Sequence, residues 1–216
     1  MISSSRFPFY EHSMKVDETK GNLPHWTQDK KLYFVTFRLA DSLPQNALRD
    51  YKLFCQWREE VLSVCGDIPE EWRKYNIVRH NRMIQYLDAG YGECILRNGK
   101  LRRIIADTLS FRDGRCCLLH AYVIMPNHVH LLIEMPNNRS VTELVGEVKK
   151  HTALEINKLL GRKGPLWQRE CYDRIVRSGH HYMKAAQYIV RNPRCCSSGE
   201  YTLYVCPALK DILGMG

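Results

Sequence analysis

The chain lacks the features of several common protein classes. No apolar run approaches the roughly 20 residues that a membrane-spanning helix needs, and residues 1–21 have no apolar core like that of a signal peptide. No Cys-x-x-Cys pair occurs, which argues against a zinc knuckle and against a thioredoxin-type redox site. The adjacent pairs Cys116-Cys117 and Cys195-Cys196 favour reduced thiols. We therefore expect a cytoplasmic protein.

Acidic residues are in short supply. Asp and Glu number 23 against 32 Lys and Arg, which gives a formal net charge of +9 and a pI near 9.1. Such an excess favours a polyanionic partner, and nucleic acid is the first candidate. The chain has 216 residues, of which 44% are hydrophobic, and this is enough for one well-packed domain with embellishments.

Two apolar runs, at 118–125 and 129–135, dominate the middle of the sequence. Pro126-Asn127 lies between them and has the chemistry of a turn, so the runs predict a β-hairpin. The second strand begins with His128-Val129-His130, and its two imidazoles share one face because side chains alternate along a strand. Two imidazoles on a rigid strand suit a metal ion, although a polar rim on the sheet would use the same pattern.

The remaining periodicities predict both strands and helices. Strands are expected at 32–39 and 166–176, and helices at about 46–65, 69–89, 101–109, 140–160 and 179–192. Ser140 and Glu143 form a capping box at the start of the best-defined helix. The order of elements predicts an α+β fold: a ferredoxin-like antiparallel sheet (βαββαβ) with helices on one face, a helical insertion and a C-terminal helix.

The helix expected at 179–192 has two distinct sides. Apolar side chains gather on one side, and the other side carries His181, Lys184, Tyr188 and Asn192. Tyr188 therefore lies one helical turn from both Lys184 and Asn192. Taken alone, the pattern also describes a tyrosine half-packed at the edge of the core.

Several short motifs occur in order between residues 23 and 193. They are LPHW at 23–26, YFVTFRL at 33–39, HAYVIMPNHVH at 120–130, LWQR at 166–169 with Tyr172-Asp173, and YIVRNP at 188–193. In this order the chain resembles the REP-associated tyrosine transposases, a branch of the HUH single-tyrosine transposases. The combination of MPNHVH with a downstream Tyr-Ile-x-x-Asn-Pro is highly specific.

The resemblance implies roles for both polar groups. The family's His-hydrophobe-His motif falls on His128 and His130, which would bind a divalent ion, Mg²⁺ or Mn²⁺, together with Asn192. The catalytic tyrosine falls on Tyr188. A free tyrosine has a pKa of about 10, so its phenolate needs a nearby cation, for which the metal and Lys184 are the candidates. The implied activity is endonuclease and strand-transfer chemistry on single-stranded DNA through a 5′-phosphotyrosine.

The family binds repeated extragenic palindromes that fold into hairpins, so the implied partner is hairpin or single-stranded DNA. By charge, the candidate contacts are Lys149, Lys150, Arg169, Arg174 and Arg177, with Arg102 as a further one, and Trp26 and Trp167 are candidates for stacking on unpaired bases. The resemblance favours a monomer over a dimer and a cytoplasmic, nucleoid-associated location.

The motifs imply three segments along the chain. These are an N-terminal arm at 1–28, the transposase domain at 29–193 with a helical insertion at about 45–110, and a tail at 194–216. The tail reads Arg194-Cys195-Cys196-Ser197 where the family usually continues with Val-Lys-x-Gly. A non-catalytic hairpin-binding protein derived from a transposase is the alternative, since basic charge and this fold suit it equally.

Overall fold

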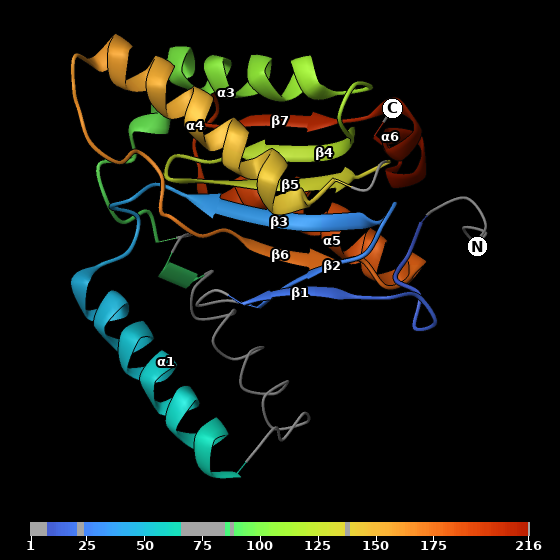
Figure 1. Cartoon of the computed structure of the whole chain (residues 1–216). Coiled ribbons are helices and arrows are strands. Elements are labelled where there is room, and N and C mark those ends of the chain that lie inside the picture. Colours follow the sequence, from blue (N-terminus) through green and yellow to red (C-terminus); the bar gives the residue numbers. More distant parts are fainter. Residues whose placement is uncertain (1–7, 21–23, 66–84, 87–88, 137–138, 216) are drawn as a thin grey trace. The chain divides into compact units, whose positions relative to one another are not determined.

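Figure 1 presents the computed structural model, which describes residues 8–20, 24–65, 85–86, 89–136 and 139–215. The chain divides into two compact units, one made of Met1–Ala40 with Ile95–Gly216 and the other of Asp41–Cys94. No helix in the described part of the chain is long and apolar enough to cross a membrane.

The first unit is built on a five-stranded antiparallel sheet with the strand order β6-β3-β5-β4-β7. The strands are β3 (Leu32–Arg38), β4 (Leu118–Ile124), β5 (His128–Glu134), β6 (Tyr172–Ile175) and β7 (Thr202–Val205). The predicted hairpin forms the pair β4-β5, and the first four strands in this order have the ferredoxin-like arrangement. The predicted α+β fold is confirmed.

Helices cover both faces of this sheet (Figure 1). The crossover helices α3 (Gly99–Arg112) and α4 (Val141–Leu160) pack together on one face, while α5 (Gly179–Arg191) and α6 (Pro207–Leu213) share a core with the other face. Two short 3-10 helices, η2 (Ile95–Arg97) and η3 (Asn192–Cys195), precede α3 and follow α5.

Side-chain alternation along β5 explains which residues face α5. Val129, Leu131 and Ile133 belong to the core beneath α3 and α4. The alternate residues His128 and His130 point to the opposite face and are completely buried there. The strand therefore holds both imidazoles rigidly beneath the helix that carries Tyr188.

Several elements were not expected from the sequence. The predicted arm contains β1 (Asp17–Lys20) and β2 (Pro24–Thr27), which pair as a separate two-stranded sheet. The predicted tail supplies β7, which adds to β4 at the edge of the main sheet, as well as α6. The strand expected at 166–176 is only β6, with Trp167 making an isolated bridge to Leu39.

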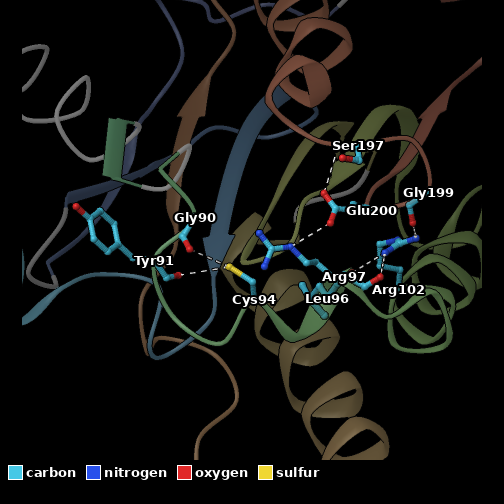
Figure 2. Close-up of polar contacts among 9 residues, drawn as sticks. All are labelled: Gly90, Tyr91, Cys94, Leu96, Arg97, Arg102, Ser197, Gly199 and Glu200. Atoms are coloured by element: carbon cyan, nitrogen blue, oxygen red, sulfur yellow. Dashed lines mark hydrogen bonds and ion pairs between the residues drawn. The ribbon is translucent and has the colours of Figure 1, made fainter.

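The second unit contains α1 (Gln45–Cys65), as predicted, and a small buried cluster of Leu43 and Ala47 with Tyr86 against them. The helix expected at 69–89 lies almost entirely outside the described residues. The insertion expected at about 45–110 overlaps this unit, whereas α3 packs on α4 in the first unit. Within the second unit, the Cys94 thiol donates to the carbonyl of Gly90 at 3.1 Å (Figure 2).

Candidate active site

Four residues predicted from the sequence meet on the α5 face of the sheet. The hydroxyl of Tyr188 lies 3.2 Å from Nε2 of His130. Asn192, at the end of α5, donates from Nδ2 to the Tyr188 hydroxyl at 3.1 Å. The imidazole centroids of His128 and His130 are 4.6 Å apart. The structure thus brings the histidine pair, the tyrosine and the asparagine into one cluster, while their chemical roles stay predictions.

The cluster forms because α5 is amphipathic and capped. Ser178 accepts a hydrogen bond from the His181 amide and begins the helix where predicted. Tyr182 and Ile189 are buried against the sheet, and Tyr188, near the edge of that buried stripe, is only half-buried. The phenol hydroxyl therefore approaches the histidines while part of the side chain stays open to solvent.

Neighbouring side chains orient both histidine rings and set the tautomer of His128. Nδ1 of His128 lies 2.7 Å from the amide oxygen of Asn127, and because that oxygen only accepts, Nδ1 must carry the proton. Nδ1 of His130 lies 2.7 Å from the hydroxyl of Thr36. In His128 this leaves the lone pair on Nε2, the nitrogen that faces the site.

His128 is held in its neutral form. Burial lowers the pKa of His128 to about 3, and the nearby Asn192 side chain opposes this shift only in part. Nε2 of His128 is buried, and it has no hydrogen-bond partner among the described residues. A buried lone pair of this kind is what a metal ligand offers.

The donor set fits a divalent ion. The described residues hold no group of three or more His, Cys, Asp or Glu side chains suited to a metal, so a third protein ligand here would be an oxygen of another residue type. Asn192 and Tyr188 supply such oxygens beside the two imidazoles. Mixed nitrogen and oxygen donors suit Mn²⁺, and Mg²⁺ with its preference for oxygen less well.

Phe34 forms the aromatic wall of the cluster. Its ring stacks on His130 with centroids 5.6 Å apart and meets Tyr188 edge-on at 5.8 Å. Thr36 lies two residues along β3 and therefore on the same face. Phe34, Thr36 and Asn127 were not predicted as site residues, although alternation along the strand at 32–39 was the signal that could have identified the first two.

Lys184 lies one turn before Tyr188 on α5 and is exposed. The pKa of the nearby His181 is lowered to about 4, first by burial and then by the positive charges of Arg174, Arg177 and Lys184. The two arginines, both exposed, are predicted DNA contacts, so Lys184 lies among them. Its support of the Tyr188 phenolate remains a prediction.

The other predicted DNA contacts lie on α4 and before β6. Lys150 and Arg169 are exposed. Lys149 is half-buried and donates from Nζ to the carbonyl of Arg169 at 2.7 Å, and burial lowers its pKa. The ammonium of Lys149 therefore already has a role within the fold.

The prediction that Arg102 contacts DNA is wrong. Its guanidinium is buried and donates to the carbonyls of Leu96 and Arg97, each at 2.7 Å. It also donates to the Gly199 carbonyl (Figure 2). A further bond, at 3.0 Å, goes to the Thr202 hydroxyl. The positive charge of Arg102 does not indicate that its side chain is hydrogen-bonded within the fold, where it links α3 to the C-terminal segment.

Trp167 is a second correction. Its indole is 6% exposed, packs edge-on against Phe37 and donates from Nε1 to the Thr152 hydroxyl at 2.9 Å. It is therefore a core residue and not a platform for bases. The side chain of Trp26 lies outside what the structure describes.

Replacing Arg102 with Ala should lower the free energy of unfolding by about 2–4 kcal/mol, because buried carbonyls lose their donors. Urea unfolding measures this change. Arg103→Ala is the matched control: Arg103 is exposed and its contact with Asp107 is a 3.9 Å surface ion pair, so a change within about 0.5 kcal/mol is expected. Equal stability of the two variants would contradict a structural role for Arg102.

Residues 98–192 match the family model described as "Transposase IS200 like", a span that includes α3, the histidine strand and α5 up to Asn192. A solved structure described as that of a REP-associated tyrosine transposase bound to a REP hairpin is similar, with 16% sequence identity, 81% of this chain and 73% of that chain covered, and a TM-score of 0.44. No curated protein matches the sequence. The segment that contains both histidines, Tyr188 and Asn192 is thus the part of the chain that is similar to the IS200-like transposases.

Proposed function

We propose that this protein is a metal-dependent endonuclease and strand-transferase that cuts and joins single-stranded DNA through a 5′-phosphotyrosine on Tyr188. The observation that carries the proposal is the 3.2 Å contact between the Tyr188 hydroxyl and Nε2 of His130. It supports the proposal because a hydroxyl that could act as a nucleophile lies beside a pair of imidazoles whose geometry suits a metal ion.

In the proposed reaction, the phenol of Tyr188, which is partly open to solvent, gives its proton to water, and the phenolate oxygen attacks the phosphorus in line. The bond to the 3′ oxygen breaks, and that oxygen leaves and takes up a proton. The hydrogen bond from Asn192 to the phenol oxygen stabilises the phenolate, because an N–H donor favours the charged form. The tyrosyl ester keeps the energy of the phosphodiester, so a second 3′-hydroxyl can displace Tyr188 and join two strands without ATP.

His128, His130 and Asn192 would hold Mg²⁺ or Mn²⁺. When bound, the ion supplies positive charge to a non-bridging oxygen of the scissile phosphate. Asn127 keeps the His128 ring in the tautomer whose Nε2 can bind the ion, and the contact with Thr36 fixes the orientation of the His130 ring.

We propose palindromic DNA hairpins as the substrate, because the motifs at 120–130 and 188–193 resemble those of the REP-associated branch. We also propose that the protein acts as a monomer. One copy of the chain places the tyrosine against its own histidines, so the site needs no residue from a second copy.

The test is a denaturing gel of the purified protein with labelled single-stranded hairpins from its genome's palindromic repeats, with and without Mn²⁺. A metal-dependent covalent band, mapped to Tyr188 by mass spectrometry, is the expected result, and the fully duplex form of the same sequence is the control. Hairpin binding without an adduct under any divalent ion would support the non-catalytic alternative. No binding at all would contradict the substrate assignment.

A further inference from the structure

Arg38 is the last residue of β3 and lies directly opposite His128 in the antiparallel pair β3-β5. Opposite residues in such a pair project from the same face, with Cβ atoms about 4.5–5.5 Å apart. Arg38 therefore leaves the sheet on the face of Thr36 and His130, one strand away from a proposed metal ligand. It is half-buried at this position.

The backbone at the end of β3 is fixed by Gln168 and by the turn that precedes His128. The carbonyl of Arg38 accepts from the Gln168 amide at 2.9 Å, and the Leu39 amide donates to the carbonyl of Asn127 at 2.9 Å. Asn127 is also the residue that orients the His128 ring. The guanidinium thus starts from a rigid point with a defined relation to the imidazoles, as a preorganised catalytic group requires.

A second cation lies near Arg38. The pKa of Lys149 is lowered, mainly by burial and also by the charge of Arg38, against the opposing effects of Cys171 and Glu170. Two like charges near each other repel, and a bound anion relieves that repulsion. Lys149 belongs to α4, on the other face of the sheet, and already donates to the Arg169 carbonyl, so Arg38 is the cation that the register directs toward the histidine pair.

We propose that Arg38 is a catalytic residue that binds the scissile phosphate through its non-bridging oxygens. The inference rests on the proposed function and adds a residue to that same site. A guanidinium offers two parallel N–H donors that match two phosphate oxygens. No bond to Arg38 forms or breaks; its hydrogen bonds strengthen as charge builds on those oxygens during the attack by Tyr188.

The first arm of the test measures single-turnover adduct formation at saturating hairpin. Arg38→Gln should lower the rate by about 10²-fold, and Arg38→Lys, which keeps the charge but loses the fork, by about tenfold. Thermal unfolding of both variants checks that they are folded at the assay temperature, and their Mn²⁺ binding should match the wild type. Lys210→Gln is the control, since Lys210 is an exposed cation on α6. This helix begins next to Cys206, whose amide donates to the carbonyl of His120, at the end of β4 away from His128. A wild-type rate in Arg38→Gln would overturn the proposal.

The second arm needs no catalysis. In a Tyr188→Phe background, hairpins carrying one neutral methylphosphonate are scanned through each step at the foot of the hairpin. At the contacted phosphate, the neutral group should weaken binding about tenfold more when Arg38 is present than in Arg38→Gln, because the metal contributes equally in both backgrounds. Absence of this coupling at every step would overturn the Arg38 proposal even if the enzyme cuts DNA. Coupling in a protein that forms no adduct would support the phosphate contact while contradicting the proposed function.

Discussion

Tyr188→Phe should abolish the covalent protein–DNA adduct, with a loss of at least about 10⁴-fold in the rate of its formation. The substitution removes only the phenol oxygen, which is the atom that contacts His130 and Asn192. The ring that meets Phe34 and His130 edge-on remains, so the packing of α5 is retained. Hairpin affinity, measured by fluorescence anisotropy, should therefore change by less than a few-fold.

Tyr182→Phe is the matched control for that experiment. Tyr182 lies on the same helix, is 1% exposed, and its hydroxyl contacts Nδ1 of His120 at 2.8 Å, away from the histidine pair. Its loss should lower stability by about 1–2 kcal/mol while adduct formation continues. An adduct that persists in Tyr188→Phe would show that the nucleophile lies elsewhere in the chain.

Local patterns in the sequence were sufficient for most of the central fold. The hairpin at 118–135, the capped helix after Ser140 and the helix after Ser178 each follow from side-chain periodicity and end signals within one element. β1, β2 and β7 were missed because short strands are stabilised by the partner they pair with, and their sequences carry little periodicity of their own.

The residues of the candidate site also fall into a group that the sequence predicted and a group that it did not. His128, His130, Tyr188 and Asn192 were predicted because each belongs to a recognisable motif, and the structure places them together. Their supporting residues depend on pairings that a sequence does not display. Phe34, Thr36 and Arg38 reach the site only because β3 pairs with β5 in a particular register, which sets Thr36 opposite His130 and Arg38 opposite His128.

The two wrong predictions have a related cause. Arg102 and Trp167 were chosen as DNA contacts by charge and by aromaticity, properties that do not indicate burial. In the fold, the guanidinium of Arg102 donates hydrogen bonds to backbone carbonyls, and the indole of Trp167 donates one to the Thr152 hydroxyl. Long side chains of this kind have an apolar body and a polar end, so tertiary packing decides whether they lie at the surface or in the core.

The double substitution His128→Gln with His130→Gln should remove saturable Mn²⁺ binding. If the wild type binds the ion only when folded, then at a hundred times Kd the metal adds about 2.7 kcal/mol to the free energy of unfolding, and the variant should show no such gain. The quantity compared is the increment on adding Mn²⁺, measured by thermal unfolding, so any cost of altering two buried residues cancels.

His151→Gln is the control for the metal experiment, because His151 is an exposed imidazole on α4 and its loss should leave the Mn²⁺ increment unchanged. The measurement uses neither DNA nor turnover and so separates the metal site from the chemistry at Tyr188. An unchanged increment in the double variant would place the ion elsewhere. If the double variant instead loses both the Mn²⁺ increment and adduct formation while it still binds the hairpin, that result would assign the buried lone pair of His128 to the metal. It would also show that the ion is needed for cutting and not for binding DNA.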